Sequence, residues 1–88
     1  MIIVTAHPPV EDTLNPDPAY VWVVAWARAD DNNAPALRES LTTMTPLPEV
    51  FVMFPSTTWI ARNVVVEEAV QGQPNLFRIR FKDGQKIK

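Results

Sequence analysis

The longest apolar segment of the chain, residues 19–28, predicts a central β-strand. Its sequence, AYVWVVAWAR, is rich in the β-branched and aromatic types that favour strands, and turn-forming residues bound it on both sides. Successive side chains of a strand point to opposite faces. One face therefore carries bulky residues and the other small ones: Tyr20, Trp22, Val24 and Trp26 against Val21, Val23, Ala25 and Ala27. Neither face suits water, so we expect both to be covered.

The N-terminal residues 1–6 predict a short first strand. His7 and the two prolines that follow it end this strand, because proline cannot donate to a sheet and restricts the residue before it. Residues 8–18 are acidic and proline-rich, which indicates a long loop before the central strand.

Residues 34–44 carry apolar side chains at helical spacing. Leu37, Leu41 and Met44 recur at i, i+4 and i+7 and form one narrow stripe. Asn33 or the asparagine before it can cap the helix, and the prolines after Met44 cannot continue it. We expect this short helix to pack on the small face of the central strand.

Residues 49–54 predict a second strand that is apolar on both faces. The order strand, helix, strand favours a right-handed crossover, which would place this strand parallel to residues 19–28. The alternative is an antiparallel placement in which the helix is an elaborate loop.

Residues 64–70 begin with three valines and predict a further strand after a single helical turn at 59–62. A helix over 56–70 is the competing interpretation. A five-residue hairpin loop at 71–75 follows.

Residues 76–82 show the cleanest alternation in the chain. Three apolar side chains face one side and three basic ones the other: Phe77, Ile79 and Phe81 against Arg78, Arg80 and Lys82. This pattern is typical of a strand buried on one face. The Asp83-Gly84 pair then predicts a hairpin turn.

Together these elements predict an α+β fold with a single domain over residues 1–88. The sheet is small, mixed or antiparallel, with four to five strands, and one short helix packs on one face. A hydrophobic fraction of 47% and a charged fraction of 20% are those of a globular domain and argue against disorder.

The net charge of −2 conceals an asymmetry between the two ends of the chain. Residues 1–75 hold three basic residues against nine acidic ones, whereas residues 76–88 hold five against one. There is no cysteine, no basic lead of a signal peptide, and no apolar run of about 18 residues that could span a membrane. We therefore expect a cytoplasmic protein, in the host cytoplasm if the chain is viral.

The sequence contains no recognisable catalytic or metal-binding motif. His7 is the only histidine, and no spacing suggests a nucleophile beside it. Glu67 and Glu68 are adjacent on a strand and should face opposite sides, so they should not reach one ion together. Asp30 and its neighbours fit turn and cap duty, because the spacing of a calcium loop is absent. With only two glycines there is no phosphate cradle, and we expect no enzyme activity, cofactor or metal.

The excess of apolar strand surface predicts a protein-binding module that is a homodimer or part of a larger assembly. Such modules include inhibitors that occupy a partner's surface, for example viral antagonists, and minor structural components of assemblies. The residue types enriched in interfaces give the candidate binding residues: Tyr20, Trp22, Trp26, Trp59, Arg78, Arg80 and Lys82. The alternative is a nucleic-acid-associated protein that uses the basic strand at residues 76–88.

Overall fold

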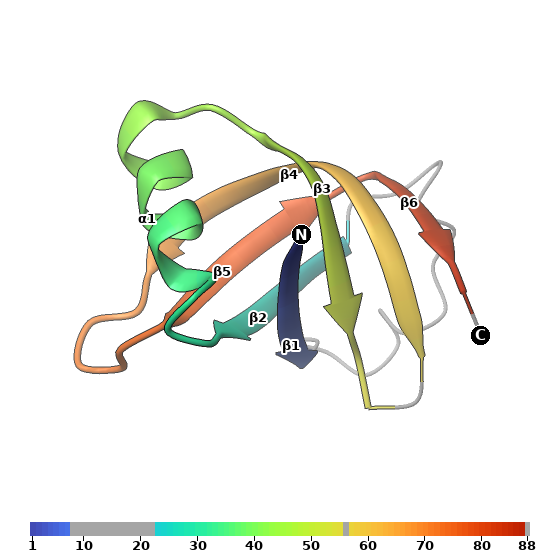
Figure 1. Ribbon diagram of the computed structural model, residues 1–88, viewed down its shortest axis with the longest axis horizontal. Helices are drawn as coiled ribbons and strands as arrows, with labels where there is room; N and C mark the ends of the chain where they lie inside the picture. The colour runs from blue at the N-terminus through green and yellow to red at the C-terminus, as the bar shows by residue number, and fades with distance from the viewer. Residues whose placement is uncertain (8–22, 56, 88) are drawn as a thin grey trace.

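Strand β4 (Thr58–Ala69) closes the sheet, because it is long enough to have partners on both of its sides. The computed structural model describes residues 1–7, 23–55 and 57–87. The other elements are β1 (Ile2–His7), β2 (Val23–Ala29), α1 (Ala34–Thr43), β3 (Leu47–Met53), β5 (Leu76–Phe81) and β6 (Asp83–Lys86). The strand order is β3-β1-β2-β5-β4-β6, and β3 also pairs with β4, so five strands form a small closed barrel (Figure 1).

The position of β3 corrects the crossover predicted from the sequence. β3 is parallel to β1, and β1 lies between β3 and β2. β1 is antiparallel to β2, so residues 49–54 are not a parallel neighbour of the central strand, and that prediction was wrong. The N-terminal strand takes the place beside β2 that the crossover would have given to β3.

The barrel interior combines alanines with large side chains on neighbouring strands. Ala25 of β2 lies opposite Ile79 of β5, and Ala27 lies opposite Phe77, with all four residues buried. A five-stranded barrel is narrow, so small residues beside large ones let the large side chains fill the centre. The small face of β2 was predicted to be the bed for the helix, but it lines the barrel interior instead.

Helix α1 covers one end of the barrel and packs mainly against β4 (Figure 1). Its buried residues are Ala34, Leu37 and Ser40, while Leu41 is half-buried. Met44 is 89% exposed and is not part of the stripe predicted for it. The reason is the helix end: Met44 is the C-cap, with a left-handed φ of 56°, so the chain turns away before its side chain reaches the core.

Asp30 organises the start of the helix. Its Oδ1 accepts hydrogen bonds from the backbone N–H groups of Asn32 and Asn33, at 3.0 and 2.8 Å. Asn33 is the N-cap residue, as predicted, but its side chain donates to the same Oδ1 of Asp30 and caps no N–H group. The side chain of Asp30 therefore holds the turn before the helix, which is the turn duty predicted for it, and no side chain of the described residues caps the helix N–H groups.

The C-terminal half of the chain follows most of the predicted pattern. Residues 58–69 are strand, which confirms the strand predicted at 64–70 and rules out both the helix over 56–70 and the helical turn at 59–62. The alternation on β5 is confirmed, with its three apolar side chains buried. The predicted hairpin turn at Asp83-Gly84 was wrong, because β6 follows a bend at Lys82 and keeps the register of β5 against β4.

The predicted α+β class with a single helix is confirmed within the described residues, although the helix caps a barrel end and the strands number six. The acidic loop at 8–18, together with Tyr20 and Trp22, lies outside the described residues. Among the described residues, no helix is long and apolar enough to cross a membrane.

Candidate functional site

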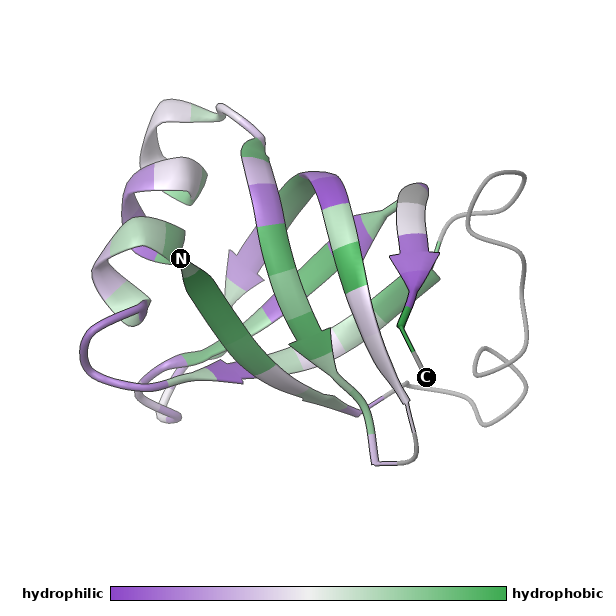
Figure 2. Ribbon diagram, turned by 45° about the vertical axis from the view of Figure 1, so that its right-hand side comes forward, coloured by the Kyte–Doolittle hydropathy of each residue, from purple (hydrophilic) through white to green (hydrophobic). Residues whose placement is uncertain are grey.

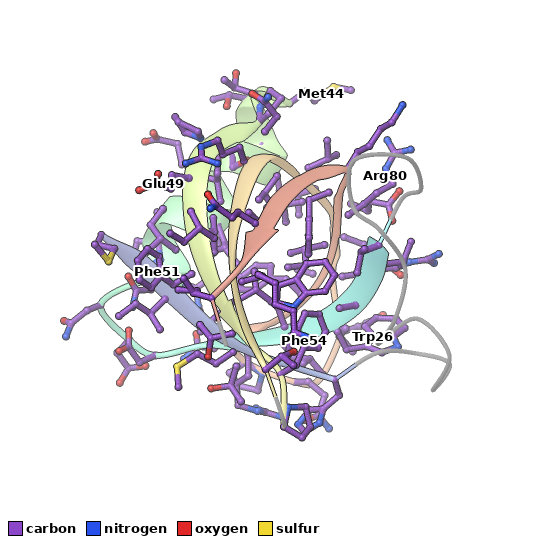
Figure 3. The ribbon with its side chains drawn as sticks, turned by 90° about the vertical axis from the view of Figure 1, so that its right-hand side faces the viewer. Trp26, Met44, Glu49, Phe51, Phe54 and Arg80 are labelled. Carbon is purple, nitrogen blue, oxygen red and sulfur yellow. The ribbon has the colours of Figure 1, made fainter. Side chains whose placement is uncertain are left out.

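The outer surface of the barrel carries two faces of different chemistry, which Figure 3 shows on opposite sides of the molecule. The charged face lies on β2, β5 and the C-terminal half of β4. The apolar face lies on β1, β3 and the N-terminal half of β4. Trp26 and Arg80 mark the first face and Phe51 the second (Figure 3).

The charged face is built around two arginines of β5 and a glutamate of β4. Arg78 Nε lies 3.3 Å from Glu67 Oε1, and Arg80 Nε lies 3.3 Å from Glu67 Oε2. The guanidinium of Arg78 also lies over the ring of Trp26, 5.8 Å from its centroid. Each carboxylate oxygen of Glu67 thus faces a different arginine.

A β-bulge adds a second carboxylate to this face. The register between β4 and β5 shifts between Val66 and Glu68. The extra residue brings Glu68 Oε1 to 3.9 Å from Arg78, which Glu67 also contacts. The expectation that the two glutamates face opposite sides was wrong, because a bulge breaks the strict alternation of a strand.

The two arginines are therefore matched in charge by two carboxylates on the same face. Arg78 and Arg80 were predicted to form a basic stripe, but both are engaged in ion pairs with β4. Lys82, the third residue of the predicted stripe, is exposed at the bend after β5. The net charge of this face is consequently much lower than the sequence of β5 alone indicates.

Replacing Glu67 with glutamine should test this network directly. We expect the free energy of unfolding to fall by about 0.5–1 kcal/mol at low salt, because the pairs are partly exposed to solvent. At about 1 M salt the difference should nearly vanish, since the Debye length is then about 3 Å, which is no longer than the distances within these ion pairs. Urea denaturation at both salt concentrations measures it. Glu68→Gln is the control and should cost less, and equal losses at both salt concentrations would contradict an electrostatic origin.

Trp59 lies in the core and not on a surface. It is 3% exposed, and its ring makes edge contacts with Phe54 and Phe81 at centroid distances of 6.0 and 5.9 Å. Among the described residues, its buried Nε1 has no hydrogen-bond partner. In the folded chain Trp59 therefore stabilises the barrel, and of the tryptophans in the described residues only Trp26 reaches the surface.

The apolar face consists of outward-pointing side chains in register on three neighbouring strands. Ile3 of β1 pairs with Phe51 of β3, and Phe51 pairs with Ile60 of β4. Ile3 is 42% exposed, and Phe51 and Ile60 are half-buried. Met53, two residues beyond Phe51 on β3, is 45% exposed. In Figure 2 the hydrophobic part of β1 lies next to that of β3.

This face was not predicted, because residues 49–54 were interpreted as a strand that is apolar on both faces. A signal was present, since Glu49, Phe51 and Met53 alternate with Val50 and Val52, and a charged residue heads the first set. In the barrel the valines point inward and are buried, while Glu49 is exposed and begins the outer row.

A groove of about 320 Å³ lies between the C-terminal end of α1 and β4. Its lining includes the apolar side chains of Leu41, Met44 and Val65, with Glu67 at its margin. The hydroxyl of Ser40, which also lines it, donates to the Thr45 carbonyl at 2.6 Å. No nucleophile and base face each other among these lining residues.

His7 is exposed at the end of β1, where its Cα partner is Trp26. Within the described part of the chain, no three histidine, aspartate or glutamate side chains gather as a metal site would require. Comparisons with protein-family models, with curated proteins and with solved structures found no match to this chain.

Proposed function

We propose that this chain is a non-enzymatic protein-binding module that docks through the apolar face. The observation that carries this proposal is the row formed by Ile3, Phe51 and Ile60 on the outside of a barrel whose interior is already filled. Outward positions of a sheet with one solvated face are ordinarily polar. Three adjacent strands that place isoleucine and phenylalanine there in register therefore favour a surface that a partner covers.

The energetics of such a contact favour the apolar face over the charged one. Burial of apolar surface contributes about 25 cal/mol per Å², so covering a few partly exposed large side chains contributes several kcal/mol. On the charged face, a partner would have to remove water from Arg78 and Glu67, which are paired but still partly exposed, and desolvating charged groups is costly. The apolar row carries no charge. The nearest ion pair among the described residues joins Glu49 and Arg62, with 3.9 Å between their charged atoms.

Two modes of action fit a module of this kind. It can inhibit a partner by occupying its working surface, as viral antagonists do, or it can be a minor component of an assembly. In this proposal the chain acts in the cytoplasm, that of the host if it is viral, as expected from its cysteine-free sequence. The nucleic-acid alternative is weakened by the ion pairs of Arg78 and Arg80, which leave fewer free positive charges for phosphates.

A pull-down from the native host tests the proposal. Three baits are compared: the wild-type chain, an Ile3→Lys/Met53→Lys variant of the apolar face, and a Lys82→Glu variant of the charged face. A second tagged copy of the chain is added to each bait, so that binding between copies is also detected. Both changed positions of the first variant are more than 40% exposed, so its fold should be kept. We expect a protein partner to be retained by wild type and by Lys82→Glu, with at least a tenfold loss in the Ile3→Lys/Met53→Lys variant.

The opposite pattern would contradict the proposal. If Lys82→Glu abolishes retention while the lysines of the apolar face leave it intact, the docking surface lies elsewhere. Each pull-down is repeated after nuclease treatment and at raised salt. Material that nuclease releases from the wild-type bait would favour the nucleic-acid alternative.

A further inference from the structure

We infer that the occupant of the apolar face is a second copy of this chain, in a twofold dimer that packs β3 and β4 of one copy on β4 and β3 of the other. This inference rests on the proposed docking function. It is carried by a specific arrangement of charge at the end of the apolar row.

The charge arrangement consists of one acidic and one basic residue on adjacent strands. Glu49 of β3 and Arg62 of β4 are Cα partners, so they lie at the same level of the sheet. Their side chains are about half exposed, at 49% and 48%, and both are accessible from outside the barrel. Their contact within the chain is long, 3.9 Å between Arg62 Nη2 and Glu49 Oε2, and is worth little in solvent.

A twofold axis that is parallel to the strands and passes between β3 and β4 exchanges these two strands. Glu49 of one copy then faces Arg62 of the other, and the symmetry makes this contact twice. One level along the strands, Phe51 of each copy faces Ile60 of the other. No like charges meet among these positions, so β3 and β4 are together complementary to their own copy in both charge and apolarity.

The neighbouring level extends the same apolar surface. Met53 and Thr58 are Cα partners there, and Ile87, which is 39% exposed, joins this level through its N–H bond to the Thr58 carbonyl at 2.8 Å. Charge is therefore confined to one end of the face, and the other levels are apolar except at Thr58. A partner of unrelated sequence would need to reproduce this pattern, whereas a second copy presents it already.

The size of the face sets the expected strength. With strands about 4.8 Å apart and residues about 3.3 Å apart along them, it measures about 14 by 13 Å. This is about 180 Å² on each copy, well below the about 800 Å² per partner of a standard interface, so we expect a weak dimer with a dissociation constant of about 100 µM and not an obligate one. The filled barrel interior agrees with a subunit that folds without its partner.

Sedimentation velocity over a concentration series tests the dimer with two charge reversals. Glu49→Arg sets two arginines against each other at each contact, and Arg62→Glu sets two glutamates against each other. Each variant alone should have its dissociation constant raised at least tenfold, so it should be mostly monomeric at the concentration where wild type is half dimeric. An equimolar mixture of the two should recover the dimer, because each introduced charge then faces its opposite in the other variant.

Glu39→Arg, an exposed reversal on α1, is the matched control and should dimerise like wild type. Circular dichroism of each variant should match wild type. A wild-type chain that stays monomeric at about 1 mM, well above the expected dissociation constant, would overturn the dimer. So would a dimer that neither reversal weakens, or a mixture that stays monomeric. The proposed docking function would survive those results if the Ile3→Lys/Met53→Lys variant still lost a different protein in the pull-down.

Discussion

Replacing Phe77 with alanine is expected to lower the free energy of unfolding by about 3–5 kcal/mol. The side chain is 1% exposed and is one of the largest in the barrel interior. Its β2 neighbour is Ala27, which is too small to fill the space that the ring leaves. Single domains of this size have stabilities near the low end of about 5–15 kcal/mol, so the variant should be close to unfolded at 25 °C.

Phe51→Ala is the matched control, because it removes the same ring from the outside of the barrel. Phe51 is half-buried on the apolar face, so its loss should cost only about 1 kcal/mol in the monomer. Urea denaturation of both variants at one low protein concentration, where the proposed dimer is dissociated, gives the comparison. Equal losses for the two phenylalanines would contradict the assignment of Phe77 to the interior and Phe51 to the outside.

The local elements of this fold could be predicted from the sequence because they depend on short-range patterns. The alternation at 76–82 predicted which side chains of β5 are buried, and the structure confirms it. The helix at 34–43 was also predictable, since its spacing and the prolines after it are local signals. The exposed position of Met44 was not predictable, because a left-handed C-cap depends on how the chain turns toward β3.

The closure of the sheet could not be predicted, because it depends on long-range pairing. Twelve residues of β4 pair with β3 through one half and β5 through the other, and no periodicity within β4 indicates two sets of partners. The parallel contact between β1 and β3 joins segments separated by more than 40 residues. The run of alanines on β2 was visible as a flat face, but its role beside large β5 side chains appears only once the barrel is closed.

The candidate site was predicted by residue type more than by position. Aromatic and basic residues were chosen because interfaces contain them, yet Trp59 lies in the core and Arg78 and Arg80 are paired with Glu67. The additional contact of Glu68 with Arg78 depends on the bulge in β4, which no sequence pattern indicated. The apolar face was missed because an apolar strand in a barrel and one between two layers have the same composition. The alternation that begins at Glu49 separates the two sets of side chains on β3, and the structure shows that the set with Phe51 and Met53 points outward.

The narrowness of the barrel leads to the second prediction, Ala27→Leu. Ala27 is fully buried beside Phe77, and leucine adds three carbon atoms where close-packed side chains leave no space. We expect the free energy of unfolding to fall by about 1–3 kcal/mol or more, because overpacking forces strained rotamers and backbone shifts. Urea denaturation measures it, with Arg28→Leu as the control. That change places the same leucine at the next position, on the exposed side of β2, and should shift stability by about 0.5 kcal/mol at most.

A double variant separates overpacking from an unrelated defect of leucine at this position. Phe77→Leu removes volume beside Ala27, so combining it with Ala27→Leu should restore part of the packing. We expect the double variant to lose about 1 kcal/mol less free energy of unfolding than the sum of the two single losses, since the effects of substitutions at residues in contact are not additive. Strict additivity would show that Ala27 and Phe77 do not share the same interior space. The alanines of β2 would then have to be explained by something other than the width of the barrel.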